Sequence, residues 1–294
     1  MDESDWLAER FQAHRPHLRA VAYRLLGSLS EADDAVQGAW LRLSRSDTSG
    51  VENLGGWLTT IVARECLDLL RVRTSRRKQP LGVHLPDPIV SRQDGVDPEQ
   101  QALLAEGVGL ALLVVLDTLA PAERLAFVLH DMFAVPFDEI APIVGRSPAA
   151  ARQLASRARR RVQGVAAMPD VDLARQREVV DAFFAAARRG DFAALLAVLD
   201  PDVVVRADRG AAPAGVSMVV RGAAAVAEQA LIFARRRARF AQSALVNGAA
   251  GVVIAPHGRL FAVMGFTVRR GKIVEIEVVA DPARLRQLDL AVLD

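Results

Sequence analysis

Residues 119–162 constrain this chain more than any other stretch, because they contain three helical segments separated by short breaks. Pro121 stands at a first helical position, where the missing N–H of proline costs nothing. Gly145 supplies a turn, and Ser147 with Pro148 marks the cap and first residue of the third helix. A helix, a tight connection, a short helix, a turn and a basic helix are the pattern of a helix-turn-helix that reads duplex DNA.

The third helix of this unit separates an apolar face from a polar one. The inward positions at helical spacing are Ala151, Leu154, Ala155, Ala158 and Val162. The outward positions are Ala149, Arg152, Gln153, Ser156 and Arg160. Arginine and glutamine can contact bases in the major groove through two hydrogen bonds, whereas Arg157, Arg159 and Arg161 are better placed for phosphates. A plain helical hairpin with a basic surface is the alternative, and Pro142 is expected to kink or shorten the second helix.

Residues 1–78 form a second helical unit. Residues 4–26 are amphipathic and end at Gly27. In the helix that follows, the expected inner face is Ala32, Ala35, Val36, Ala39 and Leu43. Trp40 and Leu41 lie elsewhere on that helix, on a side shared with acidic residues, which favours a surface that docks on another protein. The alternative is that Trp40 packs against a neighbouring helix.

A polar loop at residues 44–56 leads into a helix that Trp57 opens. The expected inner face of this helix is Leu58, Ile61, Val62, Cys66 and Leu69. Its outer side carries Thr60, Arg64, Asp68 and Arg71, and a basic run at residues 71–78 closes it. A basic helix end beside a polar loop and a tryptophan is suited to phosphates and an unstacked base. A solvated helix end with cations near its C-terminus is the alternative.

The charge balance confines any nucleic-acid contact to local clusters. Of the 294 residues, 1–167 carry 20 Lys and Arg against 21 Asp and Glu, and 168–294 carry 17 against 14. The single cysteine, Cys66, excludes an internal disulfide and a cysteine-based zinc site, and we expect it to be a small buried hydrophobe. The acidic N-terminus is no signal peptide, and no apolar run reaches the ~20 residues of a membrane span. We therefore expect a cytosolic protein without a membrane partner.

Residues 79–101 form a connector with four prolines, which disfavour regular structure. Apolar residues surround the paired prolines of the segment Leu85-Pro86-Asp87-Pro88. Such a segment often docks on protein in an extended form, and a free linker usually lacks apolar anchors. We expect this connector to lie against protein.

Residues 168–294 change to a different pattern. Two helices come first, then a strand, a third helix and a series of strands with a hairpin signal at Asn247-Gly248. The order predicts an α+β cone with a curved antiparallel meander. The candidate polar residues for chemistry are Asp208, Arg209 and His257, but acid–base work needs two groups that converge on one substrate. We expect no catalytic residue, metal or cofactor.

The order of these segments resembles bacterial sigma factors of the extracytoplasmic-function type. The likeness covers residues 10–165 and rests on EADDAVQGAWLRL, WLTTIVARECLDLLR, the Pro-rich linker and ASRARRRV. It implies a multidomain fold with a helical region 2 at residues 1–78, a linker at 79–101, a helix-turn-helix region 4 at 102–167, and an α+β domain at 168–294 that resembles SnoaL-like proteins. Gly38, where the family commonly has an acid, and Pro142 depart from its pattern.

The resemblance also implies roles for individual residues. Docking on the β′ clamp of RNA polymerase core falls to Asp33, Asp34, Gln37, Trp40 and Leu41. Recognition of the promoter −10 element falls to Asn53, Trp57, Thr60, Arg64, Asp68, Arg71, Arg73, Arg76 and Arg77. Recognition of the −35 element falls to Arg146, Ser147, Ala149, Arg152, Gln153, Ser156, Arg157 and Arg160. The expected partners are the β′ clamp and β subunits of the polymerase, promoter DNA, and a small-molecule ligand in the SnoaL-like pocket.

Sigma factors with such a fused domain form a group in which the linker and the C-terminal tail carry short motifs. This chain has Leu85, Pro86, Asp87 and Pro88 in the linker, and Asp281, Pro282, Arg284 and Leu285 in the tail. The resemblance implies that linker and tail contact each other and that the C-terminal domain regulates the sigma factor in cis. Two other readings stay open: a cyclase or isomerase with a DNA-binding appendage, and a helix-turn-helix repressor.

Overall fold

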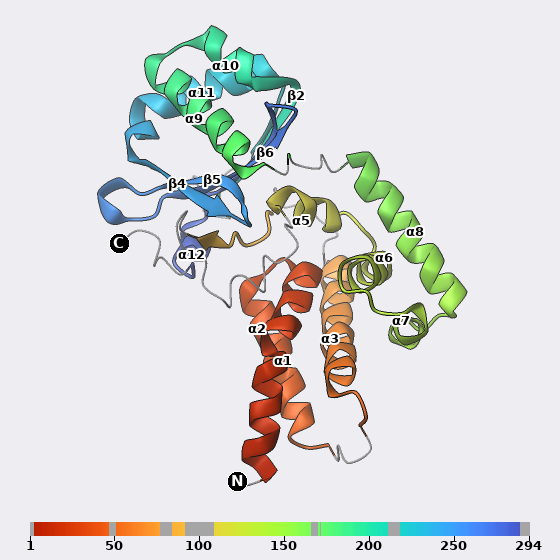
Figure 1. Ribbon diagram of the computed structural model, residues 1–294. Coiled ribbons are helices and arrows are strands. Elements are labelled where there is room, and N and C mark those ends of the chain that lie inside the picture. Colours follow the sequence, from red (N-terminus) through yellow and green to blue (C-terminus); the bar gives the residue numbers. More distant parts are fainter. Residues whose placement is uncertain are drawn as a thin grey trace. The chain divides into compact units, whose positions relative to one another are not determined.

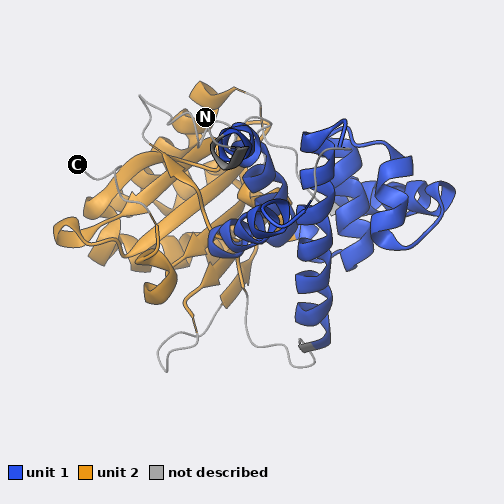
Figure 2. Cartoon of the chain, turned by 90° about the horizontal axis from the view of Figure 1, so that it is seen from below, with its two compact units in different colours: residues 1–80, 101–106, 115–165 blue, residues 81–100, 107–114, 166–294 orange. Residues whose placement is uncertain are grey.

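The computed structural model describes residues 3–46, 51–76, 84–91, 109–165, 170, 172–210 and 218–288. The chain divides into two compact units, which Figure 2 shows in two colours. Unit 1 contains residues 1–80, 101–106 and 115–165, and unit 2 contains residues 81–100, 107–114 and 166–294. The two N-terminal helical parts therefore share one unit, and the segment with the paired prolines groups with the C-terminal residues.

The first part of unit 1 consists of three helices: α1 (Glu3–Leu26), α2 (Leu29–Leu43) and α3 (Leu54–Arg76) (Figure 1). Helix α1 continues through Pro16 and ends at Gly27, whose φ of 68° is easy for a residue without Cβ. The expected inner face of α2 is confirmed, because all five of its residues are buried. Cys66 is fully buried on α3, as expected, and burial raises the pKa of its thiol.

The second part of unit 1 is the helix-turn-helix. Helix α6 (Pro121–Phe127) continues as a π-helical turn, η1 (Val128–Met132), before α7 (Phe137–Val144) and α8 (Pro148–Val165). Gly145 has a φ of 66°, and the Ser147 hydroxyl accepts the N–H of Ala150 at 3.3 Å. The turn and the cap are thereby confirmed. Pro142 is exposed, and α7 runs through it without a break.

Unit 2 is built on a sheet whose described strands follow the order β1-β4-β5-β6-β7-β2-β3. Their bounds are β1 Val90–Ser91, β2 Leu199–Asp208, β3 Met218–Arg221, β4 Ala241–Val246, β5 Ala249–Ile254, β6 Ala262–Arg269 and β7 Lys272–Val279. The expected meander is present from β4 to β7, with the Asn247-Gly248 hairpin. The earlier strand β2 joins this meander by pairing in parallel with β7 after a long connection, and the sequence pattern did not predict that pairing. β1 comes from the connector and pairs with β4.

Helices cover one face of this sheet. They are α9 (Leu173–Arg189), α10 (Phe192–Val198) and α11 (Ala223–Arg237), and the short α12 (Pro282–Leu285) follows the last strand. The core between helices and sheet contains three phenylalanine rings, Phe183, Phe184 and Phe266, with centroids 5.6–6.0 Å apart. A helical N-terminal portion followed by an α+β portion confirms the expected fold class. No helix in the described ranges has both the length and the apolar character to cross a membrane.

Candidate nucleic-acid and polymerase interfaces

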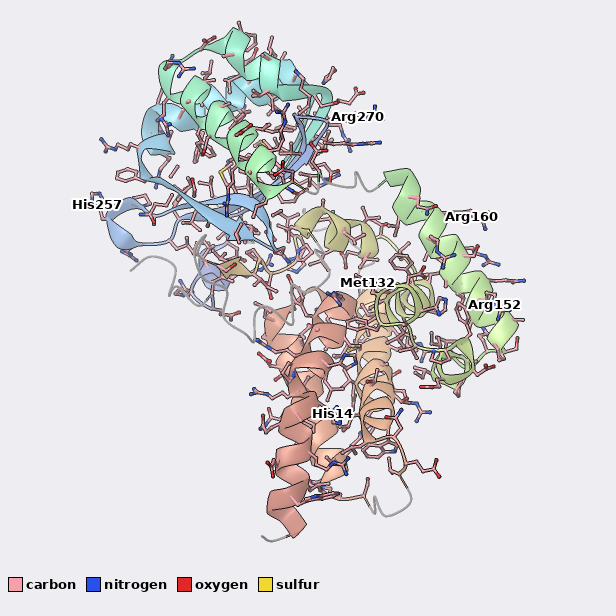
Figure 3. All side chains as sticks on the ribbon, viewed as in Figure 1. His14, Met132, Arg152, Arg160, His257 and Arg270 are labelled. Carbon is pink, nitrogen blue, oxygen red and sulfur yellow. The ribbon has the colours of Figure 1, made fainter. Side chains whose placement is uncertain are left out.

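The outward face of α8 is open to solvent. The exposed members of the expected −35 set are Arg146, Ser147, Ala149, Arg152, Gln153, Arg157 and Arg160, and Ser156 is half-buried. Figure 3 shows Arg152 and Arg160 projecting from α8. The opposite face is closed, because Ala151, Ala155 and Ala158 are fully buried. The segregation expected from the sequence is therefore present, and it leaves arginine and glutamine at positions suited to the edges of base pairs.

Internal ion pairs divide the arginines of α8 into two groups. Arg159 donates to Asp131 at 2.8 Å, and Arg161 donates to Glu123 at 3.1 Å. These two side chains, expected to meet phosphates, instead tie α8 to preceding elements. Arg157 and Arg160 have no carboxylate within ion-pair distance among the described residues, so the free positive charge lies on the outward side. Arg152 rests over the Phe137 ring, 5.3 Å from its centroid, which orients its guanidinium.

The two helical parts of unit 1 pack on each other through buried cations. Arg24 on α1 lies over the Phe133 ring at 4.7 Å, and His17 meets the same ring edge-on at 5.3 Å. Arg124 on α6 is also buried; it donates to the Arg24 carbonyl at 3.4 Å and to Asp117 at 3.0 Å. Burial, reinforced by nearby His14 and Arg24, lowers the pKa of His17. The joint therefore combines aromatic and charged groups, and sequence periodicity gave no signal for it.

This joint also explains a wrong assignment on α3. Leu69, expected on the inner face, is 37% exposed, whereas Leu67 and Leu70 are buried. Helix α3 packs against α1 and α2 on one side and against α6 and α7 on another. A second buried face arises only from this tertiary contact, so the single-face pattern could not predict it.

The expected polymerase-docking residues on α2 fall into two groups. Asp34 and Gln37 are exposed, and the apolar side chain of Leu41 is also open to solvent, with 45% of its surface exposed. Asp33 is engaged by Arg19 at 2.7 Å. Trp40 packs on Phe11 with ring centroids 5.1 Å apart, which is the contact with a neighbouring helix that the alternative interpretation described.

An open hollow of about 450 Å³ lies between the end of α2 and the start of α3. It is lined by Gly38, Leu41, Arg42, Arg45, Ser46, Trp57, Ile61 and Glu65. Arg42 and Glu65 form an ion pair at its wall, with N and O atoms 2.5 Å apart. Glycine at position 38 contributes to this space, because a Cβ there would meet only Glu65, at 4.0 Å. Of the residues that line the hollow, only Leu41 and Trp57 had been assigned to an interface from the sequence.

The expected −10 residues on and before α3 are partly free and partly engaged. Asn53, Arg64, Asp68 and Arg71 are exposed, and Trp57 and Thr60 are half-buried. Asn53 accepts the Gly56 N–H at 2.9 Å, and Arg71 pairs with Asp68 at 3.2 Å.

Arg73 donates to the Leu26 carbonyl at 2.8 Å and pairs with Glu31, so it fastens the end of α3 to α1 and α2. The side chain of Arg76 and all of Arg77 lie outside the described residues.

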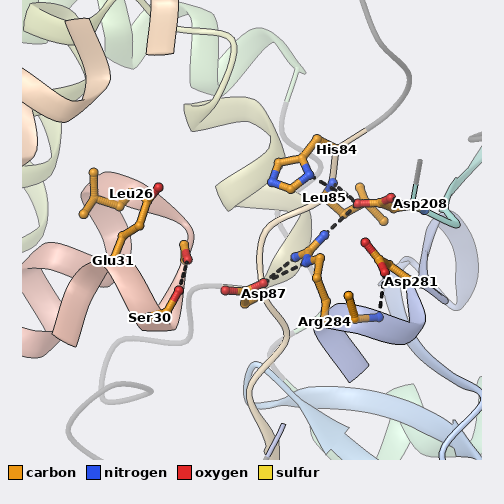
Figure 4. A network of polar contacts seen from close by, with 12 residues as sticks. Leu26, Ser30, Glu31, His84, Leu85, Asp87, Asp208, Asp281 and Arg284 are labelled. Carbon is orange, nitrogen blue, oxygen red and sulfur yellow. Dashed lines mark hydrogen bonds and ion pairs between the residues drawn. The ribbon is translucent and has the colours of Figure 1, made fainter. Parts of the chain in front are cut away.

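The linker and tail motifs meet inside unit 2 (Figure 4). Arg284 donates to Asp87 and to Asp208, each at 2.6 Å, and so joins tail, linker and the end of β2. The Leu85 N–H also donates to Asp208, at 3.1 Å. The apolar members of the two motifs are covered: Leu85, Pro86, Pro88 and Leu285 are buried. Residues 84–91, the part of the connector that the structure describes, dock on protein, as their apolar side chains predicted.

Two features fix the start of α12 and its position beside the end of β2. Asp281 caps α12 by accepting the Ala283 N–H at 2.8 Å, and Pro282 takes the first helical position. Gly210 has a φ of 76°, and a Cβ there would lie 2.7 Å from the Asp281 carboxyl carbon. Only glycine therefore allows the loop after β2 to approach the tail this closely.

Asp208 lies at the centre of this network and is 3% exposed. Burial alone would raise the pKa of its carboxyl. Hydrogen bonds from His84 and from the N–H groups of Leu85 and Gly210, together with the Arg284 charge, outweigh burial and lower the pKa to about 2. The carboxylate is thus the charged acceptor on which the linker and tail converge.

The residues considered for chemistry do not converge. His257 is exposed in the turn after β5, with a φ of 54° (Figure 3). Asp208 ends β2, three strands away in the sheet order, which corresponds to roughly 14 Å at the usual strand spacing. A general acid and base acting on one substrate need to be within hydrogen-bond reach of it, and this pair is not so arranged.

Sequence inspection missed a buried charged cluster on β2 and β7. Arg206 donates to Glu275 at 3.1 Å and to Glu277 at 3.3 Å, and Glu277 is 1% exposed. Burial, together with the negative charge of Glu275, raises the pKa of Glu277 to about 8. Their alternation with apolar residues along Lys272–Val279 was the available signal, since it places both acids on the sheet face opposite the helices.

Comparisons with known proteins agree with this geometry. Residues 10–76 match the model of the Sigma-70 region 2 family, and residues 109–162 match the model of Sigma-70, region 4. The first range covers α1 from residue 10 onward together with α2 and α3, and the second covers the helix-turn-helix up to residue 162 of α8. The class defined by fold and surface is therefore that of a sigma factor.

Similarity to particular relatives extends over more than nine tenths of the chain. The ECF RNA polymerase sigma factor SigJ of Mycobacterium tuberculosis is 42% identical over 92% of this chain and 91% of its own length. The probable ECF RNA polymerase sigma factor SigI of the same organism is 35% identical over 98% of each. The crystal structure of SigJ superposes with a TM-score of 0.79, covering 96% of this chain and 99% of that one. The chain belongs to the extracytoplasmic-function family of RNA polymerase sigma factors, so it binds RNA polymerase and directs transcription initiation at promoters.

Proposed function

We propose that unit 1 divides this task among its exposed surfaces. Asp34, Gln37 and Leu41 on α2 bind the β′ clamp of core polymerase, and α8 reads the −35 element with Arg152 and Gln153. The observation that carries the proposal is an exposed leucine on α2, together with an outward arginine–glutamine face on α8.

The −10 element is assigned to Asn53, Trp57, Thr60, Arg64 and Asp68, next to the hollow between α2 and α3. A half-buried tryptophan beside an open hollow is suited to stacking on an unpaired base. The functional division of the chain is then region 2 at 1–78, linker at 79–101, region 4 at 102–167 and a SnoaL-like domain at 168–294. The protein acts in the cytoplasm, where core polymerase and promoter DNA are located.

The C-terminal domain regulates promoter binding in cis through the linker. The support is the Arg284 bridge, which fixes the segment between the two DNA-reading regions by a buried ion pair. A tail that releases the linker changes the distance that the two regions can span. In vitro transcription by wild type, Leu85→Asp and Leu285→Asp tests this: altered promoter activity with either variant is expected, and unchanged activity with both rejects the regulatory role.

The function is binding rather than catalysis, and the polymerase carries the chemistry. Binding of a small-molecule ligand by the C-terminal domain is a second candidate function. Against it, Phe183, Phe184 and Phe266 pack on one another in the interior of this domain and form a structural core.

Transcription by core polymerase with this chain on a promoter library tests the leading function. Transcripts from defined starts are expected, whereas a chain that binds DNA but not polymerase would be a repressor.

A further inference from the structure

The C-terminal end of α11 carries a basic surface that the DNA-reading regions do not include. The cationic residues are the arginines Arg235, Arg236, Arg237, Arg239 and Arg259, and the rings near them are those of Phe240, His257 and Phe261. We call this set the α11 patch. It lies wholly within unit 2, on the last turn of α11, η2 (Ala238–Phe240) and the turn between β5 and β6.

Ring contacts within the patch form two groups. Arg237 lies over the Phe261 ring at 3.8 Å, and Arg239 lies over the Phe240 ring at 4.6 Å. Phe240 also contacts His257, with centroids 5.7 Å apart. Phe261 is itself 39% exposed. Aromatic rings thus hold two guanidinium groups in place while leaving their N–H donors available.

The arginines of the patch lack carboxylate partners. Elsewhere in this unit, Arg206 and Arg284 each join two acids. No ion pair forms at any of the five patch arginines among the described residues, and the sole acid of α11 is Glu228, far from its C-terminal turn. Cations at a helix C-terminus are favourable by themselves. That effect is confined to the last turn, so it does not account for Arg259 or for an exposed aromatic ring.

We propose that the α11 patch binds the phosphate backbone of duplex DNA without sequence preference. We choose DNA rather than another polyanion because the chain belongs to the sigma factor family. Arginine donors in a planar fork match phosphate oxygens, and the patch contains arginine rather than lysine. An anionic membrane would need a continuous apolar face beside the cations. The α11 patch instead alternates rings and guanidinium groups, which suits contact with sugars and phosphates.

The test compares two matched double variants of the full chain. Arg235→Gln/Arg236→Gln removes two exposed arginines from the last turn of α11, and Arg188→Gln/Arg189→Gln removes two from the last turn of α9. Fluorescence anisotropy measures binding to a duplex without promoter sequence as NaCl is varied. Each lost phosphate contact lowers the slope of log K against log salt by about 0.9. The α11 variant should lose a slope of about 1.8, with roughly ten- to sixty-fold weaker binding at 0.1 M salt.

Equal binding by wild type and the α11 variant overturns the proposal, as does an equal loss in the α9 variant, which would show a bulk charge effect. The proposal is also overturned if the α11 variant loses affinity for phosphatidylserine vesicles or for polyglutamate but binds DNA as tightly as wild type. Phe261→Ala should weaken DNA binding several-fold at an unchanged salt slope. Transcription with core polymerase is measured in parallel and tests the sigma-factor function separately. If the chain failed to support transcription, the difference in DNA affinity between wild type and the α11 variant would still decide whether the patch binds DNA.

Discussion

Replacing Arg284 with methionine removes the charge that joins the tail to the linker while keeping an apolar side chain of similar length. The side chain of Arg284 is 13% exposed, and the side chains of its partners Asp87 and Asp208 are 17% and 4% exposed. Methionine would leave Asp208 covered, with its remaining hydrogen bonds but without the guanidinium. We expect the docked linker to loosen, because an uncompensated buried carboxylate is costly.

Two estimates give the size of the effect. Breaking a buried ion pair by removing one partner costs about 3–5 kcal/mol. Independently, an aspartate whose pKa is about 2 in the folded protein contributes about 2.6 kcal/mol to the free energy of unfolding at neutral pH. Arg284 supplies a part of this contribution. We therefore expect a loss of about 2–4 kcal/mol. Since the folded pKa of Asp208 lies below its unfolded value, this contribution is present above about pH 4 and disappears as the pH falls toward 2.

A double-mutant cycle with Asp87→Asn isolates the pair. Amide hydrogen exchange at Leu85, whose N–H donates to Asp208, reports the local opening free energy. The coupling energy between Arg284 and Asp87 should be about 1–3 kcal/mol. Arg286→Met is the matched control, because Arg286 is exposed in the same segment. A coupling below about 0.5 kcal/mol, or an equal effect of Arg286→Met, would refute the assignment of Arg284 as the bridge.

Leu41→Asp should reduce core-polymerase binding at least tenfold in a pull-down titration without lowering stability, and unchanged binding would remove α2 as the docking surface. Arg152→Ala and Gln153→Ala should each cost about 1–3 kcal/mol of discrimination at one −35 position in a competition assay, whereas equal weakening on all sequences would show that they contact only phosphate. Glu277→Gln should stabilise the protein by roughly 1–3 kcal/mol at pH 8. The raised pKa of Glu277 makes wild-type stability fall between about pH 4.5 and about 8; equal pH profiles of wild type and variant in thermal unfolding would contradict this.

The sequence was sufficient to predict a residue's role wherever that residue acts within its own helix or turn. The Ser147 cap, the turn at Gly145 and the apolar face of α2 depend on spacing and backbone conformation, which a sequence states directly. The parallel pairing of β2 with β7 joins segments about 70 residues apart in the chain, and no local pattern encodes such a partner.

The candidate surfaces show the same limit. The outward set on α8 was predictable because helical period fixes which positions share a face. That Arg73 fastens α3 to the Leu26 carbonyl was not, because its partner comes from another helix. The Arg284 bridge lies between: the resemblance indicated that tail and linker meet, but Asp208 as the shared acceptor emerged only from the fold.

This chain directs polymerase to promoters, and we propose that it does so through two DNA-reading regions in one protein. The most direct measurement is run-off transcription by core polymerase on a promoter library, with the full chain, with Arg152→Ala/Gln153→Ala and with a truncation before Asp281. We expect transcripts from promoters that share a −10 and −35 pair. These transcripts should be lost when the −35 sequence or α8 is changed, and the truncation should alter promoter use. Absence of promoter-specific transcripts with both the full and truncated chains would contradict it.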